Sequence, residues 1–143
     1  LNVPIVANLM QGEAEVAIRK KLEIMRGVDP AQHNWITYWL IVINSENIAA
    51  GLVGFKGLPS ADGSVEIGYG INSIYQSLGY MTEAVKALIA WAFSHPECRR
   101  ITANTLPDNI RSRRVLLKNC FKETGSEGDE IHYELEKAGF LPT

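Results

Sequence analysis

One turn between a predicted strand and a predicted helix constrains this chain more than any other segment. Residues 65–71, VEIGYGI, are typical of a strand, and apolar side chains recur at helical spacing from Ala84 to Phe93. Between them, residues 76–84 read QSLGYMTEA, so Gly79 falls where the helix begins. Glycine allows the backbone to approach a ligand closely, and a helix N-terminus presents unpaired N–H groups with a partial positive charge. The turn therefore predicts an anion site, most naturally for phosphates.

Size and charge narrow the classes of protein that fit. The chain has 143 residues, which is one domain's worth, and its net charge is −2. The chain has no stripe of basic residues, which excludes a nucleic-acid backbone as its main partner. No apolar run reaches the ~18 residues of a membrane span. Because the chain begins at Leu1 rather than Met, we expect a fragment or a processed product.

The two cysteines, Cys98 and Cys120, have neither the spacing of a disulfide framework nor that of a metal site. This usage favours a reducing compartment, and we expect a cytoplasmic protein without a bound metal.

Hydrophobic periodicity predicts a regular alternation of elements. The expected helices are 13–27, about 80–93 and 110–118, and the expected strands are 35–43, 48–56, 65–71, 100–106, 121–125 and 131–136. This order of one helix, three meandering strands, and then further helices and strands predicts an α/β protein with a mixed sheet and helices on its faces.

Two details of this prediction concern burial. Residues 35–43 are apolar on both faces, so we expect a strand well inside the sheet, with Trp35 and Trp39 in the core. In the first helix, a stripe of Ile18, Leu22 and Met25 should face the sheet.

Two short patterns in this element order resemble the GNAT N-acetyltransferase superfamily, and the resemblance covers nearly the whole chain. The family signature at the turn is Arg/Gln-x-x-Gly-x-Gly/Ala; Gln76 and Gly79 match it, and Met81 departs from it. The second pattern is Asn109-x-x-Ser112, which is most like the branch containing ribosomal-protein N-terminal acetyltransferases.

The resemblance implies a GNAT-like fold for residues 1–143 as a single domain, with a central mixed, mostly antiparallel sheet of about six strands. Family members usually begin with a strand before the first helix. Here only residues 3–9 are available, interrupted by Pro4, so we expect that strand to be missing or shortened. A missing strand would leave an open edge at which a second copy could pair as a homodimer.

The function implied is acetyl transfer from acetyl-CoA, as cosubstrate, to a primary amine by direct attack in a ternary complex. The acceptor would be a small molecule or a peptide N-terminus. Glu66, Gly68 and Gly70 share one strand face and leave a floor on which a thin pantetheine arm could lie. The residues expected to hold acetyl-CoA are Gly70, Ile71, Gln76, Ser77, Leu78, Gly79, Tyr80, Met81, Thr82, Asn109 and Ser112.

The chemistry requires a base and a proton donor. Glu66 is the candidate base, acting through water, because the acceptor amine must lose a proton before it attacks. A backbone N–H near Gly70 or Ile71 could polarise the thioester carbonyl. Family members often protonate the thiolate with a Tyr seven residues after the Asn, but Leu116 occupies that position. Ser112 is the substitute that the resemblance suggests.

Other interpretations of the same residues stay open. Glu66 could face solvent, Asn109 could only cap a helix, and Ser112 could be a surface serine. The arginines Arg111, Arg113 and Arg114 could be a solvated face or could meet the 3′-phosphate of CoA. A catalytically silent acetyl-CoA sensor or interaction module is the main alternative. The third hypothesis is a protein that binds the phosphates of another nucleotide, although the sequence lacks the P-loop and dinucleotide-binding patterns. The sequence does not identify the acceptor.

Overall fold

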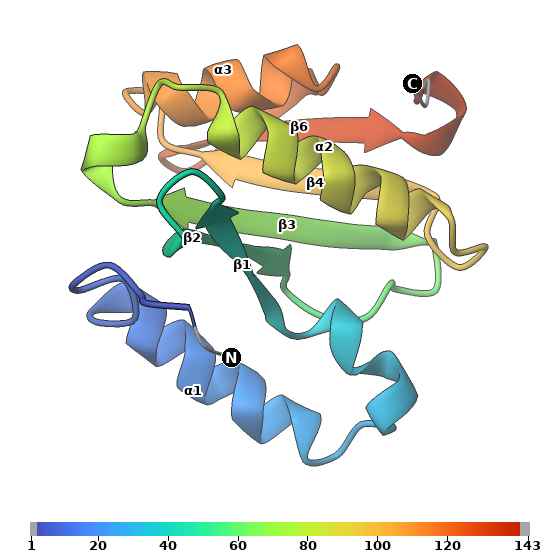
Figure 1. Ribbon diagram of the computed structural model, residues 1–143. Helices are drawn as coiled ribbons and strands as arrows, with labels where there is room; N and C mark the ends of the chain where they lie inside the picture. The colour runs from blue at the N-terminus through green and yellow to red at the C-terminus, as the bar shows by residue number, and fades with distance from the viewer. Residues whose placement is uncertain (1–2, 141–143) are drawn as a thin grey trace.

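The computed structural model describes residues 3–140 and contains one six-stranded mixed sheet with helices on both sides (Figure 1). The strands are β1 (Tyr38–Ile43), β2 (Ile48–Phe55), β3 (Ser64–Ile71), β4 (Arg100–Thr105), β5 (Lys122–Glu127) and β6 (Glu130–Glu136). The helices are α1 (Glu13–Met25), α2 (Tyr80–Phe93) and α3 (Ile110–Lys118), with short 3-10 turns η1 (Pro30–Trp35), η2 (Ser73–Tyr75) and η3 (Lys137–Gly139). The predicted element order and fold class are confirmed.

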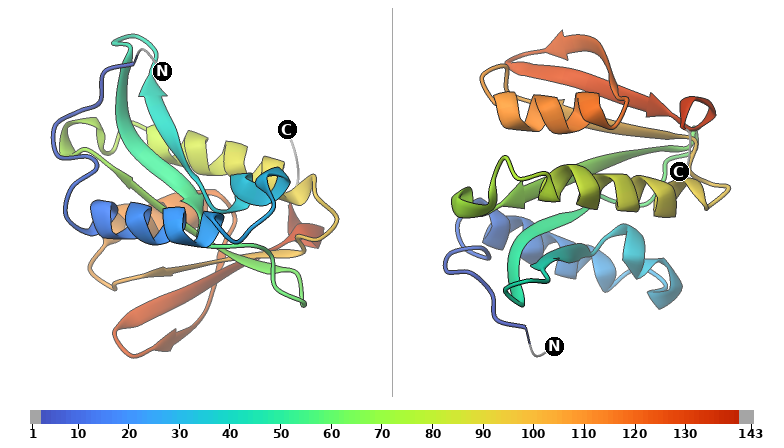
Figure 2. Two further views of the ribbon diagram at one scale, coloured as in Figure 1. Left: turned by 90° about the horizontal axis from the view of Figure 1, so that it is seen from below. Right: turned by 45° about the horizontal axis from the view of Figure 1, so that its top comes forward.

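The sheet has the strand order β1-β2-β3-β4-β6-β5, and every neighbouring pair is antiparallel except β3 and β4. Helices α2 and α3 lie side by side over one face, while α1 lies on the other side, near β1 and β2 (Figures 1 and 2). The core fills the space between the sheet and α2 and α3, and its fully buried side chains include Phe55, Val85, Ile89, Ile101, Leu116 and Tyr133.

The prediction for residues 35–43 is wrong in two respects. Trp35 ends η1 instead of starting a strand, because Pro30 stands at the first position of that turn and Asp29 accepts a hydrogen bond from the Ala31 N–H. In addition, β1 is an edge strand rather than an inner one.

The apolar character of both β1 faces has a different cause. Tyr38 faces α1, where the Lys21 amine lies 4.4 Å from the centre of its ring, and Trp39 faces α2, with its ring 6.3 Å from that of Trp91. Helices therefore cover both faces of an edge strand, although Trp39 remains 38% exposed while Trp35 is buried as expected.

The buried stripe of α1 also differs from the prediction. Leu22 is 55% exposed, and Lys21 is buried instead. The Lys21 Nζ donates hydrogen bonds to the carbonyl oxygens of Ile36, at 2.7 Å, and Phe55, at 2.5 Å. A buried lysine is tolerated here because two of its three donors have carbonyl partners, and these bonds tie α1 to the sheet.

The segment before α1, where we expected the first strand to be missing or shortened, forms a single parallel bridge between Ile5 and Ala49. The Val6 N–H donates to the Ala49 carbonyl at 3.0 Å, and the Ala49 N–H donates to the Pro4 carbonyl at 2.8 Å.

The buried amine of Lys21 predicts a specific dependence of stability on pH. Burial, and then the charge of Lys56, lower the Lys21 pKa from 10.5 to about 8. Between these values the unfolded chain binds more protons than the folded protein, so this lysine makes folding more favourable as the pH rises. We expect the free energy of unfolding of the wild type, measured in urea, to rise relative to that of Lys21→Met between pH 8 and 10.5. The same comparison with Lys20→Met, at an exposed position, should show no slope; a flat difference for Lys21 would contradict the assignment.

Candidate functional site

The site begins where β3 and β4 separate. Their parallel ladder ends at the pair Glu66 and Thr102, although β3 continues to Ile71. The Lys56 N–H donates to the Glu66 carbonyl at 2.9 Å, so the even-numbered peptide groups of β3 face β2. By alternation, the N–H groups of Tyr69 and Ile71 face the gap on the β4 side, whereas that of Gly70 faces β2. The gap is therefore edged by backbone groups outside the β3–β4 ladder.

The predicted anion turn closes the wide end of the gap. Gly79 is the N-cap of α2 in a left-handed conformation, with φ of 87°, and no side chain caps the helix. Apart from Gly79 itself and its two chain neighbours, no atom lies within 4 Å of the position that a Cβ at Gly79 would take, so the turn borders open space. The first N–H groups of α2 have no side-chain cap, which leaves them available to bind phosphate as helix N-termini commonly do.

A cavity of about 240 Å³ joins the end of β3, this turn and α3. The predicted cofactor residues that line it are Gly70, Ile71, Gln76, Ser77, Gly79, Met81, Thr82, Asn109 and Ser112. Leu78 and Tyr80 do not line it: the Leu78 side chain is 62% exposed, and Tyr80 borders a groove between α2 and β1. The structure thus brings together most of the residues that were predicted to bind acetyl-CoA.

Arg111 and Arg114, which the sequence left open as a solvated face or as partners of the 3′-phosphate, also line the cavity. The lining residues without any prediction are Tyr69, Tyr75, Val115 and Lys118. The positions 111, 114, 115 and 118 follow helical spacing, so the periodicity of α3 could have placed them on one face. Three of these four residues are cationic, and their charges favour an anionic ligand. Arg113 lies outside this set, because its guanidinium donates to the Tyr133 hydroxyl at 3.0 Å and to the Pro107 carbonyl at 3.1 Å.

Asn109 and Tyr69 hold Ser112 at the cavity wall. The Asn109 Oδ1 accepts a hydrogen bond from the Ser112 N–H at 3.1 Å and caps α3. The Tyr69 hydroxyl lies 2.9 Å from Ser112 Oγ and 3.3 Å from the Ser112 carbonyl oxygen. Burial raises the pKa of Tyr69 to about 12, so its hydroxyl keeps its proton at neutral pH.

Glu66 does not line this cavity. Strand alternation directs its side chain to the face opposite that of Tyr69. Its carboxylate lies 2.7 Å from the Lys56 Nζ and accepts a long hydrogen bond, 3.5 Å, from the Asn104 amide. The side chain is 32% exposed, so Glu66 is neither enclosed nor freely solvated.

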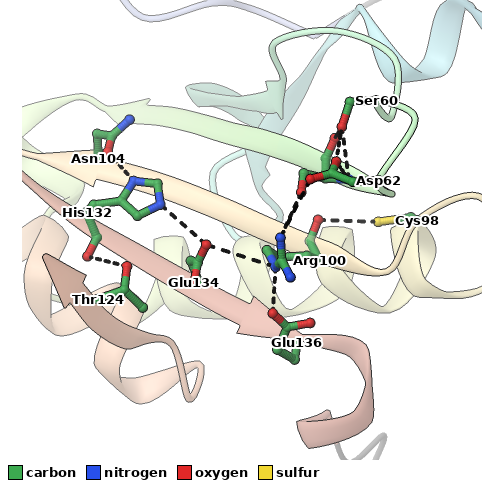
Figure 3. A network of polar contacts seen from close by, with 10 residues as sticks. Ser60, Asp62, Cys98, Arg100, Asn104, Thr124, His132, Glu134 and Glu136 are labelled. Carbon is green, nitrogen blue, oxygen red and sulfur yellow. Dashed lines mark hydrogen bonds and ion pairs between the residues drawn. The ribbon is translucent and has the colours of Figure 1, made fainter.

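A polar network continues from Asn104 along β4 and β6 (Figure 3). The His132 Nδ1 lies 2.8 Å from the Asn104 Oδ1, and its Nε2 lies 3.6 Å from a Glu134 oxygen. The same Glu134 oxygen lies 3.9 Å from the Arg100 Nε. Cross-strand pairing of these residues keeps them on the Glu66 face, so one side of the gap carries a charged surface.

One buried atom near this region lacks a partner. The Thr105 hydroxyl, in the last residue of β4, has no hydrogen bond within residues 3–140. A buried hydroxyl without a partner costs about 1–3 kcal/mol.

The part of the chain that the structure describes contains no group of three His, Cys, Asp or Glu side chains suited to hold a metal ion. None of its helices is long and apolar enough to cross a membrane.

Residues 7–122 match the family described as acetyltransferase (GNAT) domain. The uncharacterized N-acetyltransferase YjdG of Bacillus subtilis is 39% identical over 83 residues, which cover 58% of this chain and 49% of that protein. The ribosomal-protein-serine acetyltransferase of Escherichia coli is 29% identical over 82 residues, covering 57% of this chain and 46% of that protein. The chain spans about half the length of these curated relatives.

A solved structure agrees with the fold. The ribosomal-protein-S5-alanine acetyltransferase of Vibrio fischeri superposes with a TM-score of 0.70 and 25% sequence identity. The superposition covers 86% of this chain and 73% of that one. Relatives therefore include ribosomal-protein acetyltransferases, the branch that Asn109 and Ser112 indicated.

The Asn109 cap generates a prediction about stability. Replacing Asn109 by Ala removes the side-chain acceptor of the Ser112 N–H and should lower the free energy of unfolding by about 1 kcal/mol, as measured in urea. Asn109→Asp keeps an acceptor oxygen at the N-terminus of α3 and should stay within a few tenths of a kcal/mol of the wild type. Equal losses in both variants would contradict the capping role.

Proposed function

The chain belongs to the GNAT acetyltransferase family, and on that premise we propose that it is an N-acetyltransferase that moves an acetyl group from acetyl-CoA to a primary amine. The observation that carries this proposal is the cavity that joins the β3 end, the uncapped turn before α2 and the cationic face of α3. Those three parts match the three chemical parts of the cosubstrate.

Each part of acetyl-CoA has chemically suitable partners. The open N–H groups around Gly79 suit the pyrophosphate. The main-chain groups of Tyr69 and Ile71 suit a pantetheine arm, because its amides can pair with the strand as an added strand would. The cations Arg114 and Lys118 suit a further phosphate at the cavity wall.

The attack on the thioester needs a neutral amine. Glu66 accepts the proton of the acceptor ammonium through water, because its carboxylate stands on the face where β3 and β4 begin to separate. The N–H of Tyr69 or Ile71, which faces the gap, polarises the thioester carbonyl. Gly70, the other candidate donor, directs its N–H towards β2. Direct attack in a ternary complex requires no acetylated intermediate.

Departure of the CoA thiolate needs a proton on the opposite face. Leu116 has no proton to give and is fully buried. Ser112 lines the cavity, and its Oγ is 2.9 Å from the protonated Tyr69 hydroxyl. Ser112 Oγ passes its proton to the thiolate while it takes one from the Tyr69 hydroxyl, which solvent then reprotonates.

The acceptor class is a primary amine, and peptide N-termini are the first class to test. Relatives include a ribosomal-protein-serine acetyltransferase and a ribosomal-protein-S5-alanine acetyltransferase. The face that carries Glu66 also carries Glu134 and Glu136, but Arg100 pairs with both, so the relatives rather than these charges set the choice of acceptor.

Binding of the cosubstrate is the first experiment. Calorimetric titration should show saturable binding of acetyl-CoA and none of ATP or NAD. Gly79→Ala should weaken binding by about tenfold, because a Cβ strains the left-handed turn and stands in the open space before α2. Equal binding of all three nucleotides would contradict the proposal.

Glu66→Gln tests the base. Release of free thiol from acetyl-CoA, in the presence of peptides with free N-terminal Ala or Ser, should fall by about 10²–10⁴-fold while acetyl-CoA affinity is kept. Glu136→Gln removes another carboxylate from the same face and serves as the matched control. If the wild type binds acetyl-CoA but releases no thiol with any amine, the protein is a catalytically silent acetyl-CoA sensor and the enzyme hypothesis is wrong.

A further inference from the structure

Lys56 brings a primary amine of the protein itself next to the candidate base. Its Nζ lies 2.7 Å from the Glu66 Oε2. Lys56 directly follows β2, and its N–H donates to the Glu66 carbonyl, so the two residues are cross-strand neighbours with side chains on one face. The mechanism above makes no use of this amine.

The course of the Lys56 side chain points to the gap. A Cβ built on Gly68 would stand 3.2 Å from the Lys56 Cε, so the lysine stem crosses β3 at a glycine. Gly68 is two residues beyond Glu66, where the pairing of β3 with β4 has ended. The missing side chain at Gly68 therefore lets the amine lie over the strand that edges the gap.

A surface ion pair alone explains little of this arrangement. Exposed pairs contribute about 0–1 kcal/mol, and the Lys56 side chain is 56% exposed. The arrangement does, however, meet two needs of acetyl transfer: an amine within hydrogen-bond distance of a carboxylate base, and a position beside the expected thioester.

We propose that Lys56 is an autoacetylation site, and that acetyl-CoA bound in the gap between β3 and β4 acetylates this lysine in the same molecule. This proposal rests on the proposed function and adds an acceptor to it. The Lys56 ammonium gives one proton to Glu66, and the neutral Nζ attacks the carbonyl carbon of the thioester. An N–C bond forms and the C–S bond breaks, with its electron pair left on sulfur. The second proton that Nζ loses goes to solvent, the thiolate takes up one proton, and the products are acetyl-lysine and CoA.

The neighbouring Lys21 is a poorer acceptor despite its lowered pKa. Burial is the main cause of that pKa of about 8, and both observed hydrogen bonds of its amine go to the carbonyls of Ile36 and Phe55. The charge of Lys56 is the second cause, which places the two amines in one neighbourhood. Only Lys56 of the two combines exposure with a carboxylate partner.

The test is peptide mass spectrometry of the whole chain after incubation with acetyl-CoA at pH 8. Acetylation of Lys56 should be at least about tenfold faster than that of Lys86 and Lys122, which are exposed on α2 and β5, because only Lys56 is held beside base and thioester. Urea-unfolded protein serves as the control, because acetylation of its lysines is purely chemical and needs no folded site. Lys56→Arg keeps a cation beside Glu66 but should remove the fast modification.

Glu66→Gln should slow Lys56 acetylation to the rate of the other lysines. Equal rates at all lysines, or the same Lys56 rate in unfolded protein or in Glu66→Gln, would overturn the inference. Thiol release with added amines but none of the Lys56 modification would overturn this inference and leave the proposed function standing. Absence of acetyl-CoA binding in the calorimeter would overturn both.

Discussion

The parallel pairing of β3 with β4 lasts for only three residue pairs, from Ser64 with Arg100 to Glu66 with Thr102. Beyond it, β3 stays paired with β2 and β4 stays paired with β6, so both strands remain extended while they separate. Backbone N–H groups along such a gap need partners, and a ligand with amides can supply them. The gap beside β3 and the position of Glu66 at its start follow from this early end of one ladder.

The gap divides the chemistry between the two faces of the sheet. On the face covered by α2 and α3 lie Tyr69, Ser112 and the cations of α3, which suit phosphates and a leaving thiolate. On the other face lie Glu66 and Lys56, with the network of Asn104 and His132 beside them. Because side chains alternate along a strand, neighbouring residues of β3 can serve both faces.

Hydroxyl groups reach the cavity from an unexpected element. Leu116, at the position where the family resemblance led us to look for a tyrosine, is fully buried in the core. The Tyr69 hydroxyl comes instead from β3 and contacts the first turn of α3 at Ser112. Packing of Leu116 and hydrogen bonding of Tyr69 thus fix α3 against the sheet from two sides.

The order of helices and strands, the glycine turn before α2 and the cap at Asn109 were determined by the sequence alone. Each depends on residues close together in the chain: periodicity over one element, the left-handed conformation at Gly79, and a side chain that bonds a backbone N–H three residues on. Most of the cavity lining was predicted from the family resemblance, because its two signature patterns lie in the segments 69–82 and 109–118 that line the cavity.

Tertiary structure decided those features that the spacing of residues along the chain cannot encode. The sequence did not reveal that β1 is an edge strand, that Lys21 rather than Leu22 is buried, that Tyr69 meets Ser112, or that Lys56 stands beside Glu66. Each of these depends on contacts between elements distant in the chain. Burial of an amine is acceptable only when remote carbonyls satisfy it, and a pair of side chains forms only when the strand register sets them opposite each other.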